Sequence, residues 1–171
     1  PDVGIIIKTN RGSGTTIDRN VTSNLLKQFI EQTRQGPYPK VYLVHGNLSP
    51  TEVSTLYTDK KVKALVTGTR GEGFGLPILE AAASGLPVIA TNYSGHLDFM
   101  NLGRFISIDY KMQDIPKQKI DGKIFVEGAK WAEIDESDFK NKVEKFKRKP
   151  DMPLQWAKEL KDRVREEFSF K

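Results

Sequence analysis

Residues 67–98 read TGTRGEGFGLPILEAAASGLPVIATNYSGHLD, and this stretch decides how the rest of the chain is interpreted. It predicts the end of a buried strand, a glycine-rich turn, a short helix and a second buried strand. Glycines lack a Cβ, so the backbone of the turn can come close to a ligand. The start of the helix adds unpaired N–H groups and the positive end of the helix dipole. Together these features favour a site for a diphosphate.

Two glutamates, Glu72 and Glu80, flank the predicted helix start. The carboxylate of Glu80, about one turn into the helix, can accept strong hydrogen bonds from the two adjacent hydroxyls of a ribose. Taken singly, each feature has a structural interpretation. A glycine-rich segment is often only a tight turn, and a glutamate in the first turn often only complements the dipole. The order of turn, glutamates and helix is more informative than any one part.

Outward from this stretch, apolar runs typical of strands alternate with amphipathic segments typical of helices. Strands are expected at residues 3–9, 41–45, 62–67, 86–90 and 105–108, and helices at 21–35, 50–57 and 79–83, the last with Pro77 in its first turn. The pattern predicts an α/β fold, a Rossmann-like doubly wound domain with a mostly parallel sheet. The strand at 3–9 is expected to be covered on both faces.

Ligands of such sheets bind outside the carboxyl ends of the strands. The loops after Thr9, His45, Thr67 and Thr91 are therefore expected to share one rim.

The C-terminal third has a looser pattern. Residues 111–130 are expected to form an irregular polar loop with a short strand at 124–126. Helices at 136–147 and 154–168 are expected to close the chain over residues 135–170, separated by Pro150 and Pro153. The prediction is one donor-binding domain over residues 1–171.

Composition narrows the classes of function. The chain has 171 residues, a formal net charge of +5 and no cysteine. Most of the basic excess alternates with acids near the C-terminus, which argues against a nucleic-acid partner. The absence of cysteine favours a reducing, cytoplasmic location, and no run is long and apolar enough for a transmembrane segment. The abrupt apolar start after Pro1 suggests a fragment of a longer protein.

The string EGFGLPILE, from Glu72 to Glu80, and the following AAASGLPVIA resemble the signature of retaining glycosyltransferases of the GT-B fold, family 4. The likeness extends to the turns at residues 46–49 and 94–98 and to residues 131–133. It implies that the chain is the C-terminal, nucleotide-sugar-binding half of a hexosyltransferase. The acceptor, which would be a sugar, a lipid or a protein, would bind mainly to an N-terminal domain absent here. The isolated fragment is accordingly expected to be inactive.

The resemblance also implies roles for individual residues. Glu72 would be the catalytic carboxylate beside the donor sugar, and Glu80 would bind the ribose. Main-chain amides at residues 74–76 would meet the sugar or diphosphate, and the turn at residues 47 and 48 would lie against the nucleobase. The donor-binding positions are Gly73, Phe74, Gly75, Leu76, Glu80, Asn47, Leu48, Thr69, Arg19 and Lys8.

The chain departs from the family pattern at two positions. Asn20 stands where a lysine usually joins Arg19 in neutralising the diphosphate. Lys8, Arg11 or Arg70 could compensate. Asp98 stands where the family more often has glutamate.

No metal site and no tightly bound cofactor are expected, and the nucleoside-diphosphate sugar is the donor substrate. Two distant histidines without cysteine do not suit zinc, and no Asp-x-Asp pair follows a strand. His45 is interpreted as structural, whereas His96 is either structural or a ligand contact. Two alternative functions remain: a non-catalytic nucleotide-binding or interaction module, and another enzyme of the same fold, such as a sugar-nucleotide epimerase.

Overall fold

The computed structural model describes residues 3–168, and its residue contacts divide the chain into two compact units at Glu52. Each unit is described by itself below, and the single domain over residues 1–171 stays a prediction. The elements in order are β1 (Gly4–Thr9), α1 (Thr16–Thr33), β2 (Lys40–His45), α2 (Pro50–Thr58), β3 (Leu65–Thr67), α3 (Leu76–Ser84), β4 (Val88–Thr91), α4 (Leu97–Met100), β5 (Ile106–Ile108), β6 (Tyr110–Asp114), the 3-10 turn η1 (Lys117–Lys119), β7 (Lys130–Ile134), α5 (Glu136–Arg148) and α6 (Asp151–Phe168).

The first unit is built on a pair of parallel strands. β1 and β2 pair in register from Gly4 opposite Lys40 to Thr9 opposite His45. The expectation that the first strand is covered on both faces is wrong, because Ile5 and Ile6 stay 47% and 44% exposed. Among the described strands β1 pairs only with β2, so its apolar run is not sandwiched as in the centre of a wide sheet.

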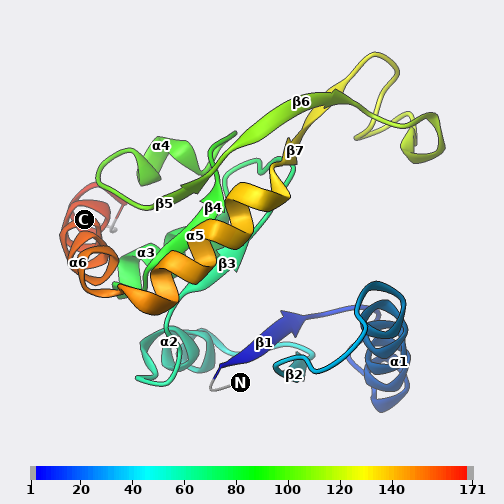
Figure 1. The fold of residues 1–171 in the computed structure, drawn as a ribbon, viewed down its shortest axis with the longest axis horizontal. Helices are drawn as coiled ribbons and strands as arrows, with labels where there is room; N and C mark the ends of the chain where they lie inside the picture. Colours follow the sequence, from blue (N-terminus) through cyan, green and yellow to red (C-terminus); the bar gives the residue numbers. More distant parts are fainter. Residues whose placement is uncertain (1–2, 169–171) are drawn as a thin grey trace. The chain divides into compact units, whose positions relative to one another are not determined.

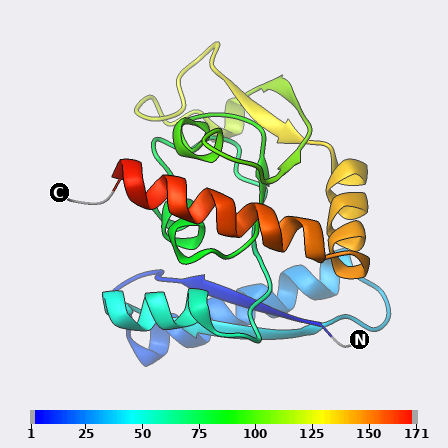
Figure 2. The same ribbon diagram turned by 90° about the vertical axis from the view of Figure 1, so that its left-hand side faces the viewer.

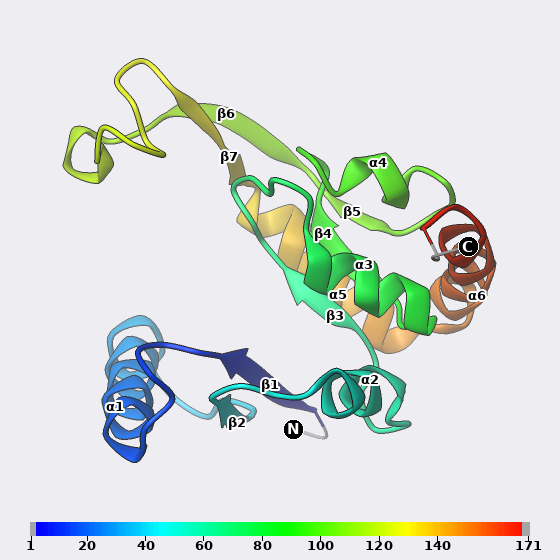
Figure 3. The ribbon, with the colours of Figure 1, turned by 180° about the vertical axis from the view of Figure 1, so that it is seen from behind.

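The second unit contains a three-stranded parallel sheet in the order β3-β4-β5. Its pairing runs from Leu65 opposite Val88 and from Ile89 opposite Ile106. Helix α5 lies over one face of this sheet and α3 over the other, as the two opposite views in Figures 1 and 3 show. Parallel strands with helices on both faces confirm the predicted α/β fold class.

Helix α6 completes the core of the second unit (Figure 2, orange to red). Leu160 and Val164 of α6 pack in one buried cluster with Ile78 and Ala81 of α3. The contact is reinforced by arginine, because Arg165 Nε donates a 2.8 Å hydrogen bond to the carbonyl of Ala83 near the end of α3. Carbonyls in the last turn of a helix lack intrahelical partners, so this bond fastens α6 to α3.

The expectation of an irregular loop at residues 111–130 is only partly right. Its two ends form the antiparallel hairpin β6–β7, paired from Tyr110 opposite Ile134 to Asp114 opposite Lys130. The hairpin continues from β5 and extends away from the sheet (Figure 1). Pairing between segments about twenty residues apart supplies backbone hydrogen bonds that local patterning does not reveal.

No strand forms at residues 124–126, contrary to the prediction. The carboxylate of Asp121 instead accepts hydrogen bonds from the amides of Lys123, Ile124 and Phe125. These bonds hold the segment in a local turn, which an aspartate side chain commonly stabilises. They also hold the pKa of Asp121 below its usual value, the bond from Lys123 most strongly.

Several element boundaries differ from their predicted positions, three of them with a clear effect on the fold. Helix α1 begins at Thr16 rather than at 21, because Thr15 and Asp18 form a reciprocal capping box. Strand β3 begins at Leu65 rather than at 62. Helix α6 begins at Asp151 and includes Pro153, which therefore does not separate the last two helices. A proline in the first turn is tolerated because its missing N–H would have no partner there.

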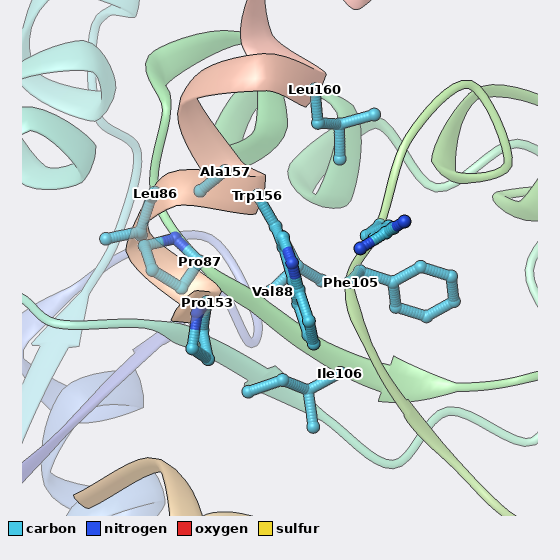
Figure 4. Close-up of a pocket in the computed structure, with 10 residues that line it drawn as sticks. Leu86, Pro87, Val88, Phe105, Ile106, Pro153, Trp156, Ala157 and Leu160 are labelled. Atoms are coloured by element: carbon cyan, nitrogen blue, oxygen red, sulfur yellow. The ribbon is translucent and has the colours of Figure 1, made fainter. Parts of the chain in front are cut away.

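A small apolar pocket lies between α6 and the amino ends of β4 and β5 (Figure 4). Its labelled lining includes Trp156 and Ala157 from α6 and Val88 from β4. A volume of about 10 Å³ is room for about one water molecule. The pocket is at the end of the strands opposite to the glycine-rich turn, so it is a packing defect rather than the predicted site.

The core at α6 leads to a stability prediction. Leu160 is 2% exposed, so Leu160→Ala is expected to lower the free energy of unfolding by about 3 kcal/mol through lost burial and a cavity. Leu154→Ala is the matched control on the same helix, because Leu154 is 40% exposed and its truncation should cost about 1 kcal/mol or less. Urea unfolding followed by circular dichroism measures both. Equal losses would contradict the placement of α6.

None of the helices within residues 3–168 has the length and apolar character that a membrane span requires.

Candidate functional site

The glycine-rich turn between β3 and α3 is held by two hydroxyl groups. Thr69 Oγ1 donates to the carbonyl of Gly71 at 3.0 Å. Ser94 Oγ accepts the amide N–H of Glu72 at 2.6 Å and donates to the carbonyl of the same residue at 3.2 Å. The amide of Gly95 also donates to the Glu72 carbonyl, at 3.1 Å. The loop after Thr91 therefore contacts the loop after Thr67, as the common rim predicts for this unit.

Gly95 allows the two loops to approach this closely. A Cβ on Gly95 would overlap the carbonyl oxygen of Gly73 and lie 2.9 Å from that of Glu72. Gly71 and Gly73 have no atoms within 4 Å of the corresponding position. Packing thus requires a glycine at position 95 in the supporting loop, while Gly71 and Gly73 of the turn face open space.

Helix α3 begins without a side-chain cap. Its N-cap residue Gly75 has φ 85° and ψ 50° and makes no capping hydrogen bond from a side chain. Leu76, the first helical residue, is 60% exposed. The ring of Phe74 packs 5.4 Å from that of the buried Phe99, although Phe74 itself stays 38% exposed. At this start Pro77 has no N–H, and the amide of Ile78 donates to the Gly75 carbonyl at 2.9 Å. The amide of Leu76, the first of the helix, is therefore the one that can bind an anion.

The two glutamates lie on either side of the helix start, as the sequence predicts. Glu72 is half-buried in the turn and Glu80 is exposed on α3. Burial raises the pKa of Tyr57, and the nearby Glu80 carboxylate raises it further. Tyr57 of α2 is therefore a neighbour of Glu80 that the sequence did not indicate.

His96 is fully buried, which favours the structural interpretation over ligand contact. Its Nε2 lies 2.8 Å from the carbonyl of Thr91. A carbonyl only accepts, so Nε2 carries the proton. Its Cβ lies 3.0 Å from where a Cβ on Gly75 would be. His96 therefore packs beneath the turn and supports it.

The first unit contains predicted donor-binding residues at the carboxyl ends of its strands. Lys8 Nζ donates to the carbonyl of Gly46 at 2.7 Å, and Asn10 Nδ2 donates to Asn47 Oδ1 at 2.5 Å. The loops after Thr9 and His45 are thus joined within this unit. Leu48 is half-buried beside Asn47.

Helix α1 differs from α3 at its start. The carboxylate of Asp18 accepts hydrogen bonds from the amides of Ser13 and Thr15, and its pKa is lowered chiefly by the Thr15 hydroxyl. The side chain of Thr15 in turn caps the amide of Asp18. Arg19 and Asn20 are exposed beside this cap. Because α1 is closed by its own residues, the open helix start is that of α3.

Arg70 is engaged by the hairpin. Its Nε and Nη2 donate to the two carboxylate oxygens of Glu133 at 2.8 and 2.9 Å, and its guanidinium lies 4.4 Å from the ring centre of Trp131. The amide of Ala132 donates to the Arg70 carbonyl at 3.1 Å. Strand β7 is therefore fastened to the loop before the glycine-rich turn. Because the charge of Arg70 is paired with Glu133, Arg70 is less suited to replace the positive charge that a lysine at position 20 would supply.

The Arg70–Glu133 pair makes stability depend on pH. The hydrogen bond from Arg70 lowers the pKa of Glu133 below 4.5. The stabilisation of the folded state by this pair is therefore present above pH 4.5 and is lost as the pH falls through the lowered native pKa. The side chains of Arg70 and Glu133 are 51% and 38% exposed, so the ion pair contributes only about 0.5 kcal/mol to the free energy of unfolding. Glu133→Gln should show this loss at pH 7, and the loss should shrink as the pH falls through the lowered native pKa.

Urea unfolding at several pH values measures this difference, with Glu127→Gln at an exposed hairpin position as the control. A loss for Glu133→Gln that stays constant as the pH is lowered into the acid range would contradict the ion-pair explanation.

Sequence reasoning missed Ser94 as a residue of the site. The signal was present, because a serine follows the strand at residues 88–91 and precedes a glycine. Its hydrogen bond to Glu72, 22 positions away, is a tertiary contact that spacing does not reveal. Among the described residues, no group of three or more His, Asp or Glu side chains gathers where it could hold a metal ion.

Comparison with known proteins gives two findings. The family model described as "Glycosyl transferases group 1" matches residues 22–121, more than half of the chain. A "Sucrose synthase" of Melioribacter roseus is 35% identical over 79 residues, which are 44% of this chain and 10% of that protein. The match thus spans about a tenth of the length of that relative.

Proposed function

Because this chain belongs to the group 1 glycosyl transferases, we propose that its second unit binds a nucleoside-diphosphate sugar as the donor for glycosyl transfer. The observation that carries the proposal is the uncapped start of α3 at Gly75, with Glu72 before it and Glu80 one turn into it. The backbone amide at the helix start and the positive end of the helix dipole suit the diphosphate, and an exposed carboxylate suits a ribose diol.

In this proposal the two glutamates contact different parts of the donor. Glu72 lies beside the sugar and Glu80 binds the ribose. The backbone at Gly73, Phe74, Gly75 and Leu76 receives the diphosphate, and fixed amides stabilise the charge that develops on the leaving phosphate. The packing of the Phe74 ring against Phe99 is compatible with a role for the Phe74 backbone. The roles of Thr69, Lys8, Arg19, Asn47 and Leu48 stay predictions from the sequence.

The same proposal extends to the stereochemistry of the transfer, its cofactor requirement and the acceptor. The transfer would retain the configuration at the sugar, would need no protein-bound metal or tightly bound cofactor, and would belong to a GT-B enzyme of family 4. The acceptor, a sugar, lipid or protein, would be bound mainly by another domain. The similarity to a sucrose synthase supports transfer of a sugar unit in general.

Calorimetric titration of this chain with UDP, GDP, ADP and their glucose or mannose derivatives tests the proposal. We expect one nucleotide to bind and its sugar derivative to bind more tightly, because the sugar adds contacts at Glu72. Absence of binding by every nucleotide, also with an N-terminal half restored, would contradict it.

That negative outcome would favour a non-catalytic module, for which Asn20 in place of a lysine and the pairing of Arg70 with Glu133 are the supporting observations. Product analysis with and without acceptor separates transfer from epimerisation of the sugar nucleotide, since epimerisation needs no acceptor.

A further inference from the structure

Ser94 has a backbone conformation that side chains rarely adopt. Its φ is 81°, and it is the one non-glycine residue with positive φ in the part of the chain that the structure describes. This conformation costs free energy for any residue with a Cβ. Such strain persists where surrounding contacts impose it, and it concentrates at functional sites. The Ser94 carbonyl accepts the Leu97 amide at 3.0 Å, and the Ser94 side chain contacts Glu72.

The hydroxyl of Ser94 binds both backbone polar groups of Glu72. It accepts the Glu72 amide at 2.6 Å and donates to the Glu72 carbonyl at 3.2 Å. The following amide, that of Gly95, donates to the same carbonyl at 3.1 Å. Both sides of one residue are thus fixed by a loop that follows a different strand, β4.

The glycines beside Glu72 have no side chains that could fix it, although Thr69 Oγ1 holds the Gly71 carbonyl at 3.0 Å. Gly71 and Gly73 stand on either side of it, and neither has atoms within 4 Å of the place where a side chain would begin. Glycine has the freest backbone of all residues. The direction of the Glu72 side chain therefore depends on the hydrogen bonds to its own backbone.

We propose that Ser94 is a positioning residue, which fixes the backbone of Glu72 so that the carboxylate is held toward the donor sugar. This inference rests on the proposed function of Glu72. Loss of the Ser94 hydroxyl leaves the α3 amides and Glu80 in place, because neither contacts it. The substitution should consequently affect recognition of the sugar and spare that of the nucleotide.

Two variants of Ser94 separate positioning from folding. Ser94→Ala removes the hydroxyl and keeps the strained φ, whereas Ser94→Gly removes the hydroxyl and relieves the strain. Ser94→Gly should therefore melt at a temperature no lower than Ser94→Ala. If both variants lose sugar recognition equally, the loss follows the hydroxyl and not stability. Ser54→Ala, at an exposed serine of α2, is the matched control.

The first measurement is the ratio of the Kd of the bare nucleotide to that of its sugar derivative, determined by calorimetry. In both Ser94 variants we expect this ratio to fall roughly 3-fold to 10-fold, the worth of about one hydrogen bond, with the Kd of the bare nucleotide within about 2-fold of wild type. Unchanged ratios, or equal weakening of both ligands, would overturn the inference.

The second measurement is hydrogen exchange of the Glu72 amide by NMR, which needs no ligand. Its exchange should accelerate in both variants and stay unchanged in Ser54→Ala. A wild-type chain that binds nucleotides without preferring the sugar form would overturn the proposed function and the positioning role with it. Accelerated exchange with an unchanged sugar preference would overturn the positioning role alone.

Discussion

Gly95→Ala is expected to lower the free energy of unfolding by about 3 kcal/mol, although it adds one methyl group. The added Cβ would overlap the carbonyl oxygen of Gly73 and lie 2.7 Å from its carbonyl carbon. Backbone atoms cannot rotate away as the end of a long side chain can. The loop at residues 94–96 must then move off the turn and lose the Gly95–Glu72 hydrogen bond.

Gly71→Ala is the matched control for this prediction. Its Cβ would meet no atom within 4 Å and its φ is not positive, so the substitution should change stability by about 0.5 kcal/mol or less. Both variants can be compared by urea unfolding. A Gly95→Ala protein as stable as Gly71→Ala would show that the two loops are not packed as described.

Glu80→Ala is expected to weaken the binding of the bare nucleotide roughly 10-fold to 100-fold, because hydrogen bonds to a charged group are worth about 1.5–3 kcal/mol. Glu72→Ala should leave bare-nucleotide affinity within about 2-fold and weaken the sugar derivative by roughly 10-fold. Calorimetry with both ligands separates the two effects. Glu166→Ala, at an exposed position of α6, removes the same charge and is the control.

Equal losses of bare-nucleotide affinity in Glu72→Ala and Glu80→Ala would contradict the division of the donor between the two carboxylates. A loss in Glu166→Ala as large as that in Glu80→Ala would indicate a general charge effect instead of a specific contact.

The elements that could be predicted from sequence are those whose signal is local. The helix expected at residues 50–57 is an example, since α2 covers Pro50–Thr58. A local capping box fixes its start, because the Ser49 amide donates to Glu52 at 2.7 Å and the Ser49 hydroxyl accepts from the Glu52 amide at 3.3 Å. The turn and helix at residues 71–84 likewise follow from glycine, proline and apolar spacing. Local chemistry and tertiary packing agree at these places, so the predictions hold.

The features that could not be predicted depend on contacts between distant residues. The β6–β7 hairpin requires Tyr110 to find Ile134, and the exposure of Ile5 depends on how many strands join β1. The candidate site shows the same limit. Glu72 and Glu80 could be predicted from their positions around a helix start, whereas the contact of Ser94 with Glu72 could not, because it joins loops after different strands.

The attachment of α6 to α3 has a consequence for the order of folding during synthesis. The hydrogen bond from Arg165 to Ala83 joins residues 82 positions apart. Bringing such distant residues together lowers the entropy of the chain before the stabilising packing contacts form. A ribosome releases α3 well before α6. Until α6 is synthesised, Ile78 and Ala81 lack Leu160 and Val164, their packing partners in the buried cluster. The nascent second unit therefore exposes an apolar helix face during this interval, when chaperones are most useful to it.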